Sequence, residues 1–323
     1  MYVDDLIVAS DASGIHTELI AALQKNFEIS QLGDIHYYLG IEVERDDRGD
    51  FFINQAKYIN QVVTSNGLSD AKVSKMPLDP GYLKQDGDDV PLPDNAEYQK
   101  VVGQLLYLAV NTRPDISAAI SILSRKTAAP TQTDWNELKR IIRYLKGTCY
   151  YRLRVSKTED REELVGYSDA DWAENTADRK SNSGHIFLFN GGTISWSCRK
   201  QTCVALSTAE AEFIALAEAT QEALWLKRLL EDLGEDSTVT IHEDNQSCLK
   251  MLEKEKFSNR TKHIATKYHF IRDVKEKDEV KYIYCPTEDM VADILTKPLS
   301  GVRVSKLAEA SGLAPAARGG VLE

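Results

Sequence analysis

The second half of the chain carries a fixed succession of apolar segments, and this succession limits the possible folds more than any other feature. Three strand-like segments are followed by a long helix; their ranges are 165–169, 184–189, 193–198 and 208–233. Further elements are expected at 238–243 (strand), 246–252 and 263–275 (helices), 280–284 (strand) and 290–295 (short helix). Three strands followed by alternating helices and strands describe one mixed sheet with helices packed against it.

The first half predicts a smaller unit and a group of helices. Strand-like residues, a helix with an apolar stripe from Ile15 to Phe27, a hairpin and a closing helix are expected at 2–10, 15–27, 35–55 and 55–63. Residues 76–95 are rich in Pro, Gly and Asp, which is typical of an exposed connection. Helices are expected beyond it at 98–110, 115–126 and 133–147.

These segments divide the chain into five parts. They are a strand-and-helix unit at 1–68, a linker at 69–95, a helical region at 96–157, the mixed-sheet domain at 160–300 and a small-residue-rich, flexible tail at 301–323. A chain of 323 residues is too long for one typical core, so more than one domain is expected.

Composition limits the class of protein. No apolar run is long enough to span a bilayer and the N-terminus does not resemble a signal peptide, so a cytosolic or nuclear protein is expected. The five cysteines form no Cys-x-x-Cys pair, which indicates reduced thiols. A net charge of −11 disfavours non-specific electrostatic binding of nucleic acid, so any site that binds nucleic acid must be a local one.

One basic stretch stands out in this acidic chain. Its members are Lys139, Arg140, Arg143, Lys146, Arg152 and Arg154. It is either the solvated face of a helix or a track for nucleic acid, and the sequence leaves both interpretations open.

Four acids lie at the ends or rims of the predicted elements in the second half. They are Asp169, Glu212, Asp244 and Asp293. Carboxylates from neighbouring strand ends and adjacent helices can converge, hold two Mg²⁺ ions about 4 Å apart and support hydrolysis of a phosphodiester. Coincidence is the alternative, because the chain has 50 acidic residues, and Asp171 and Glu210 compete with two of the four. Glu210 fits a capping box with Ser207, which favours Glu212 for the site.

Five motifs in this half occur in a specific order. They read Tyr-Ser-Asp-Ala-Asp-Trp at 167–172, Ser-Thr-Ala-Glu-Ala-Glu-Phe at 207–213, Glu-Asp-Asn-Gln-Ser at 243–247, Arg-Thr-Lys-His-Ile at 260–264 and Ala-Asp-Ile-Leu-Thr-Lys-Pro-Leu at 292–299. Together they resemble the ribonuclease H module of Pol polyproteins from copia-type LTR retrotransposons. Tyr-Val-Asp-Asp at 2–5 resembles the Tyr-x-Asp-Asp motif of reverse transcriptases, and the segments near 32–41, 113–116 and 143–148 resemble the parts that follow it.

The resemblance implies an α/β fold, a ribonuclease H-like mixed five-stranded sheet with flanking helices, preceded by a truncated reverse-transcriptase palm and a helical thumb or connection region. It also implies a reaction, the endonucleolytic hydrolysis of RNA in RNA/DNA hybrids, leaving 3′-hydroxyl and 5′-phosphate ends. Asp169, Glu212, Asp244 and Asp293 match the family's metal ligands for two Mg²⁺ ions, for which Mn²⁺ can substitute.

Asp4 and Asp5 match polymerase ligands. In the resembling family polymerase catalysis also needs a third Asp and the fingers, which lie ahead of this motif. We therefore expect these two acids to be vestigial and the chain by itself to carry out no DNA synthesis.

The hydrolase part departs from the family pattern at two points. The loop at 285–289 lacks the His that many ribonucleases H place before the last helix, and Ala265 stands where an acid is expected. His263 or His269 could substitute as a proton shuttle or phosphate contact, whereas a surface or core histidine is the alternative.

Candidate substrate contacts are short polar or basic side chains beside the four acids. They are Asn182, Ser183, Arg199, Lys200, Gln201, Asn245, Gln246 and His263. Binding of a hybrid through sugar hydroxyls and shape, with little base reading, is expected. Trp172 and Trp196 either stack on sugars or belong to the core.

The expected partners are an RNA/DNA hybrid and other Pol segments, without a membrane. The expected location is the cytoplasm, within virus-like particles if the element is active, or the nucleus. The rival interpretation is a non-catalytic relic or domesticated protein that folds and binds nucleic acid without chemistry. The sequence leaves the oligomeric state open.

Overall fold

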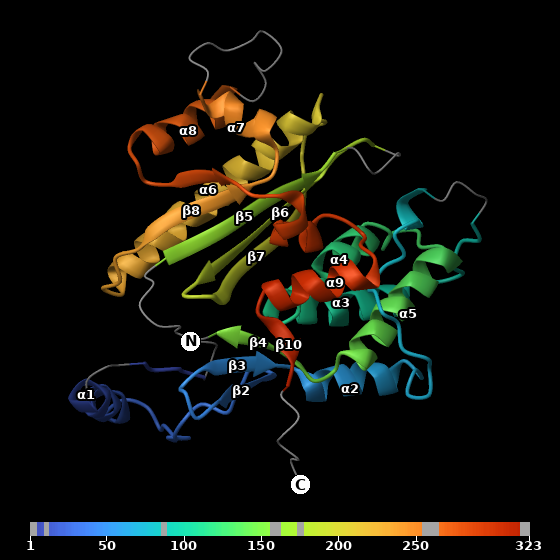
Figure 1. Ribbon diagram of the computed structural model, residues 1–323. Coiled ribbons are helices and arrows are strands. Elements are labelled where there is room, and N and C mark those ends of the chain that lie inside the picture. The colour runs from blue at the N-terminus through green and yellow to red at the C-terminus, as the bar shows by residue number, and fades with distance from the viewer. Residues whose placement is uncertain are drawn as a thin grey trace.

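Two five-stranded sheets organise the protein (Figure 1). The computed structural model describes residues 5–9, 13–84, 89–155, 163–172, 178–253 and 265–316. The strand order is β1-β2-β3-β4-β10 in one sheet and β7-β6-β5-β8-β9 in the other. No helix in the described part of the chain is long and apolar enough to cross a membrane.

The second sheet is the mixed sheet that the sequence predicts. Its strands are β5 (Glu163–Asp171), β6 (Asn182–Phe189), β7 (Gly192–Lys200), β8 (Thr238–Glu243) and β9 (Lys281–Tyr284). The first three pair antiparallel, whereas β5, β8 and β9 run parallel. Because parallel neighbours end at the same edge, residues that close β5 and β8 lie close together.

Helices cover one face of this sheet. They are α6 (Thr208–Asp232), α7 (Gln246–Glu253) and α8 (Ala265–Glu276), and Figure 1 shows them together on one side. Alternation along β6 explains the two faces: Phe187 packs in the core under α6, whereas its neighbour Ile186 packs in a different core on the other face. Ser207 caps α6 by accepting a hydrogen bond from the backbone N–H of Glu210 at 3.3 Å.

The other sheet combines segments from both ends of the chain. Its strands are β1 (Tyr37–Tyr38), β2 (Ile41–Arg45), β3 (Phe51–Asn54), β4 (Tyr151–Val155) and β10 (Leu313–Pro315). The predicted hairpin is confirmed as β2 and β3, which pair antiparallel. Strands β4 and β10 were not predicted; they pair with each other, and β4 also pairs with β3.

The prediction of a flexible tail at 301–323 is wrong for its described residues. Helix α9 (Gly301–Ala310) buries Val304, Leu307 and Ala308, and β10 buries Leu313. The apolar positions 304, 307 and 308 follow helical spacing, so the helix has a buried face despite its small residues. Gly312, with φ of +75°, makes the turn into β10.

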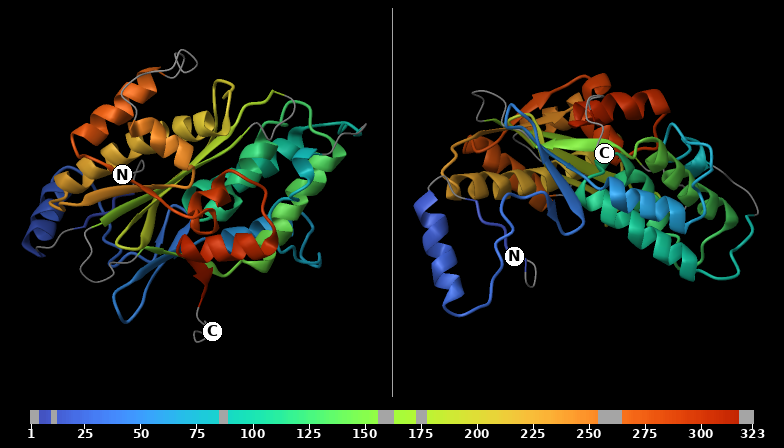
Figure 2. Two further views of the ribbon diagram at one scale, coloured as in Figure 1. Left: turned by 45° about the horizontal axis from the view of Figure 1, so that its top comes forward. Right: turned by 90° about the horizontal axis from the view of Figure 1, so that it is seen from below.

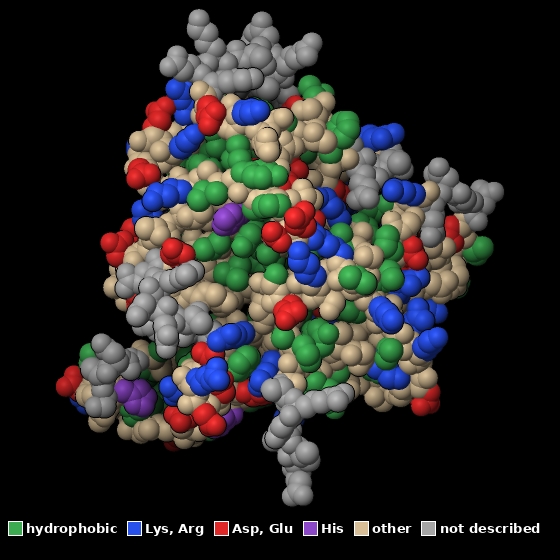
Figure 3. Space-filling model, in the orientation of Figure 1, with side chains coloured by type: hydrophobic (Ala, Val, Ile, Leu, Met, Phe, Trp, Pro, Cys, Tyr) green, Lys and Arg blue, Asp and Glu red, His purple; other side chains and the backbone are tan. Residues whose placement is uncertain are grey.

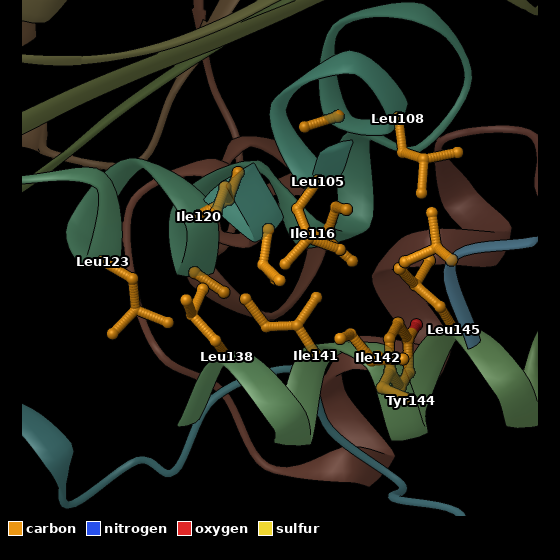
Figure 4. Close-up of a cluster of buried hydrophobic side chains, with 14 of the residues drawn as sticks. Leu105, Leu108, Ile116, Ile120, Leu123, Leu138, Ile141, Ile142, Tyr144 and Leu145 are labelled. Atoms are coloured by element: carbon orange, nitrogen blue, oxygen red, sulfur yellow. The ribbon is translucent and has the colours of Figure 1, made fainter. Parts of the chain in front are cut away.

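The helices of the first half pack around one core (Figure 4). They are α2 (Ala56–Ser65), α3 (Ala96–Asn111), η2 (Pro114–Ile116), α4 (Ser117–Ser124) and α5 (Gln132–Gly147). The prediction of an exposed connection at 76–95, within the linker at 69–95, is wrong in part. Leu78 is buried in this core, and so is Tyr82 of η1 (Tyr82–Lys84). The Tyr82 hydroxyl also bonds to Asp134, so the segment is tied to α5.

The first residues pack less than the sequence predicts. Helix α1 (Ser13–Gln24) forms, but Ile15 is 60% and Phe27 65% exposed, so the predicted apolar stripe is not buried. Figure 2 shows α1 standing apart from the rest of the protein. Residues 5–9 form no strand, and the remainder of the predicted strand at 2–10 lies outside the described residues.

A third core joins the two sheets. It contains Ile186 of β6 together with Leu153, Leu307 and Leu313. Two hydrogen bonds from β7 lead away from the mixed sheet: Trp196 Nε1 donates to the Ala109 carbonyl of α3 at 2.8 Å, and Thr193 Oγ1 donates to the Ser311 carbonyl, just before β10, at 2.7 Å.

Candidate metal centre

Three of the predicted acids converge at one end of the mixed sheet. Asp169 lies near the end of β5, Asp244 directly follows β8, and Glu212 faces them from the second turn of α6. Each offers a carboxylate oxygen, and these oxygens lie within 4.8 Å of one another. Asp169 and Glu212 are buried, whereas Asp244 is half-buried. Oxygen donors grouped in this way suit a hard divalent cation such as Mg²⁺.

The fourth predicted acid, Asp293, is not a member of this group. It lies in η5 (Val291–Leu295), where it is 4% exposed. Lys297 Nζ connects it to the centre, lying 2.7 Å from Asp293 Oδ1 and 3.0 Å from Asp169 Oδ1. Arg303 Nη2 contacts the other oxygen of Asp293 at 2.9 Å. Asp293 therefore faces two cations, and it joins Asp169 through one of them.

Hydrogen bonds hold the buried carboxylates in place. The backbone N–H of Ala170 donates to Glu212 Oε2 at 2.7 Å, which ties α6 to β5. The hydroxyl of Thr296 donates to Asp169 Oδ2. These contacts fix the orientation of both carboxylates before any ligand arrives.

Burial dominates the electrostatics of the centre. It raises the pKa of Asp169 to about 6, although Lys297 acts in the opposite direction. Burial also raises the pKa of Glu212, and the nearby charge of Asp169 adds to this effect. For Lys297 burial alone would lower the pKa, but attraction by Asp169 and Asp293 outweighs it and raises the pKa. The site thus has an excess of negative charge that a cation would stabilise.

Sequence reasoning missed Glu243, a further acid at this end of the sheet. It is fully buried; Oε1 accepts a hydrogen bond from the Asn245 N–H at 3.0 Å, and Oε2 has no hydrogen-bond partner among the described residues. Burial raises the pKa of its carboxyl, with backbone hydrogen bonding opposing. The signal was the two-residue period of β8, which places Val239, Ile241 and Glu243 on one buried face.

The two competing acids have structural contacts. Asp171 Oδ2 accepts a hydrogen bond from Asn182 Nδ2 at 2.7 Å. Glu210 Oε2 accepts one from the Leu206 N–H at 3.1 Å, next to the start of α6. The preference for Asp169 and Glu212 over these neighbours therefore fits the geometry.

Two predicted substrate contacts do not fit that role. Asn182 is 1% exposed, and its side chain bonds to Asp171 and Arg125. Ser183 is 2% exposed and accepts a hydrogen bond from Gln201 Nε2 at 3.1 Å. Both lie at the start of β6, where Arg125, directly after α4, and Gln201, directly after β7, bond to them, so they support the protein rather than a ligand.

The other predicted contacts differ in accessibility. Arg199 and Gln246 are exposed, whereas Lys200 pairs with Asp178. The Asn245 side chain accepts a hydrogen bond from the Cys248 N–H at 3.0 Å and so caps α7. Asn245 thus has a structural contact, whereas Arg199 and Gln246 are open to a ligand.

The remaining predicted residues are exposed, packed in a core or outside the described residues. His263 and Asp4 fall outside them; Asp5 is exposed, and His269 lies exposed on α8 with its ring against Tyr268. Trp172 is 50% exposed, whereas Trp196 packs in the core between the sheets.

The basic stretch makes mostly internal contacts. Figure 3 shows Lys and Arg side chains gathered over α5. Arg140 pairs with Glu137, Arg152 with Glu44 and Arg154 with Asp50. These ion pairs favour a structural surface over a nucleic-acid track.

Comparison with known proteins places this arrangement in a family. Residues 1–80 match the family described as reverse transcriptase (RNA-dependent DNA polymerase). The chain is 36% identical, over 92% of its length, to the Pol polyprotein of transposon TNT 1-94 from Nicotiana tabacum, and covers 23% of that protein. It is 35% identical, over its whole length, to the Pol polyprotein of transposon RE2 from Arabidopsis thaliana, and covers 22% of it.

The chain belongs to the Pol polyproteins of copia-type retrotransposons. It spans less than a quarter of the length of these Pol relatives. Among solved structures, the LC11 ribonuclease H1 isolated from compost matches 45% of this chain and 97% of its own length, with 16% identity and a TM-score of 0.34. The predicted resemblance to Pol polyproteins is confirmed, and the three-acid group lies in the part of the chain that carries the ribonuclease H-like motifs.

Proposed function

We propose that this Pol segment hydrolyses the RNA strand of RNA/DNA hybrids, with Asp169, Glu212 and Asp244 holding a divalent metal ion. The observation that carries the proposal is the convergence of these three carboxylates within 4.8 Å at the end of the mixed sheet. The three carboxylates come from three elements that lie far apart in the sequence. Acids that are neighbours on the surface by chance would not need three such elements to converge.

The chain's own residues have separate parts in this reaction. Asp169, Glu212 and Asp244 supply the ligand oxygens, and the Ala170 N–H and Thr296 hydroxyl keep two of them oriented. When bound, a divalent ion lowers the pKa of water and stabilises charge on the phosphate. Exposed Arg199 and Gln246 are available to contact the sugar-phosphate backbone, and the products carry 3′-hydroxyl and 5′-phosphate ends.

The test is cleavage of a labelled RNA/DNA hybrid in Mg²⁺ or Mn²⁺ by the wild type and the variants Asp169→Asn and Asp244→Asn. We expect each variant to lose activity by more than about 100-fold, because even outer neighbours of metal ligands affect activity by about 10- to 100-fold. Asp289→Asn is the matched control, because Asp289 is an acid in η4 (Thr287–Asp289) that pairs with Lys306 outside the centre.

An inactive but folded wild type would contradict the proposal. It would instead favour a non-catalytic relic that binds nucleic acid. We expect no DNA synthesis from this chain in a primer-extension assay. Asp5 is exposed, and among the described residues it belongs to no group of three or more acids that could hold a metal ion.

A further inference from the structure

Helix α6 carries a row of exposed apolar side chains outside the face that packs on the mixed sheet. Leu226 and Leu230 belong to the buried face and pack in the core beneath the helix. Trp225, Leu229 and Leu233, in contrast, are 57%, 41% and 71% exposed. They follow one another at intervals of four residues, so they form one continuous row, the α6 ridge. Single exposed apolar side chains are ordinary, whereas a contiguous row marks a surface that binds a partner.

The α6 ridge lies far from the carboxylate group. Glu212 is in the second turn of α6, and Leu229 follows it by about 25 Å along the helix axis. The ridge is therefore near the opposite end of the helix from the acids that converge at the end of the sheet. A partner that binds the ridge does not have to cover those acids.

Two opposite charges lie beside the ridge. Arg228 and Asp232 are both exposed, and no ion pair joins either of them to another described residue. At 3.6 residues per turn, both side chains lie on the same side of Leu229. This side of the ridge thus offers a positive and then a negative charge along the helix, which fits a partner with the same charges in reverse order.

A second copy of the chain supplies that reverse order. When two α6 helices pack antiparallel about a two-fold axis at Leu229, Trp225 of each copy faces Leu233 of the other. Arg228 of each copy then lies within about 3 Å, measured along the helix axis, of Asp232 of the other, on the same side of the pair. A parallel pair would separate these charges, because its two-fold axis puts them on opposite sides.

We propose that the α6 ridge is the interface of a homodimer in which two copies pack these helices antiparallel. One helix face buries less than the about 1,600 Å² of a standard stable interface, so the dissociation constant is about 10 µM. The apolar row supplies the affinity, and the two reciprocal charge pairs fix the register, because exposed ion pairs contribute little affinity. The inference does not rest on the proposed function.

Sedimentation velocity of the full chain tests the dimer. We expect the average mass to rise from one chain toward two between about 1 and 300 µM. Leu229→Asp should weaken association by more than about 30-fold, because it places two carboxylates together in an apolar contact. Leu32→Asp is the matched control: it introduces the same charge at a leucine that is 90% exposed, and it should leave the dissociation constant unchanged.

Charge reversal tests the antiparallel register. Arg228→Asp and Asp232→Arg should each weaken the dimer by about tenfold, because each brings like charges together at two symmetric places. The double variant Arg228→Asp/Asp232→Arg restores opposite charges and should return to within about threefold of the wild type. Both positions are exposed, so these variants are expected to fold.

Three results would overturn the inference. A wild type that stays monomeric up to about 1 mM would leave the ridge to a different partner, such as another Pol segment. A dimer that Leu229→Asp does not weaken would use another surface. A double reversal no tighter than the single ones would exclude the antiparallel register. Because hybrid cleavage is no part of this test, the inference and the proposed function can fail independently.

Discussion

A fully buried carboxylate such as Asp169 is costly without a compensating charge, and its neighbours show how the protein compensates it. Lys297 and Thr296 both donate to it, yet burial still raises its pKa to about 6. A proton and the proposed metal ion would therefore compete for the same oxygens near neutral pH.

This competition predicts how metal affinity depends on pH. Because the pKa of Asp169 is raised, the carboxyl is ionised at pH 7 and gains a proton as the pH falls through about 6. We expect Mn²⁺ affinity to fall by up to about tenfold for each pH unit below that value. In the ion-free protein the raised pKa affects the stability of the fold. Between about pH 4 and pH 6 the folded state binds more protons than the unfolded state, so the free energy of unfolding decreases as the pH rises through this range. Mn²⁺ titration at several pH values checks the first expectation, and an affinity unchanged between about pH 7 and pH 5 would contradict it.

Gly184 of β6 lets η5 approach the sheet. An added Cβ would lie 2.7 Å from Thr296 Cγ2 and 2.9 Å from Leu295 Cβ, so Gly184→Ala must displace the turn that carries Asp293 and Lys297. We expect a loss of about 1–3 kcal/mol in the free energy of unfolding, measured by urea denaturation, together with weaker Mn²⁺ binding. Gly103→Ala is the control, because nothing lies within 4 Å of its Cβ in helix α3, and it should be neutral or stabilising by up to about 1 kcal/mol.

Single residues of the candidate site could be predicted where they lie at the end of a strand or near the start of a helix. Asp169, Glu212 and Asp244 follow from the ends of strands and the start of a helix. The sequence showed Lys297 only as a member of a motif. Its contacts with Asp169 and Asp293 could not be predicted, because they depend on how η5 packs against β5 and β6. The burial of Asn182 was not predicted, because polar character in the sequence does not reveal that its side chain bonds to Asp171 and to the distant Arg125.

At the scale of elements, local patterns predicted segments with strong periodicity and missed those that depend on distant pairing. Helix α5 begins at a capping box in which Thr131 and Asp134 exchange hydrogen bonds. Strand β4, in contrast, is short and pairs with β3 and with β10, at the far end of the described chain. No window of neighbouring residues contains that information, so the complete β1-β2-β3-β4-β10 sheet could not be derived from the sequence.

The connection between η2 and α5 gives a prediction for an element junction. Arg113 is fully buried, pairs with Asp115 at 2.7 Å and donates to the Thr148 carbonyl at 3.1 Å. Arg113→Met would leave Asp115 buried without its cation, so we expect a loss of about 3–5 kcal/mol in urea denaturation. The double variant Arg113→Met/Asp115→Leu removes both charges and should recover much of the loss. A single variant as stable as the wild type would contradict this account.

At the scale of the whole molecule, the core between the sheets makes the two parts of the chain depend on each other. The sequence predicted separate units, but Leu153, Leu313 and Ile186 pack together across the junction. Folding of the sheet that carries the metal centre is then coupled to pairing of β4 with β10, although neither strand contributes a residue to that centre.

This coupling predicts the outcome of Leu313→Ala. Leu313 is 1% exposed, and truncation of a buried leucine costs about 2–5 kcal/mol through lost burial and the cavity left behind. Because the core is shared, hydrogen exchange measured by mass spectrometry should show weaker protection of both β3 and β5, rather than of β4 and β10 alone. Leu32→Ala is the matched control, because Leu32 is 90% exposed and its truncation should change stability by less than about 0.5 kcal/mol. If protection of β5 stays at the wild-type level while β4 and β10 open, the two sheets fold independently and the metal centre does not depend on the end of the chain.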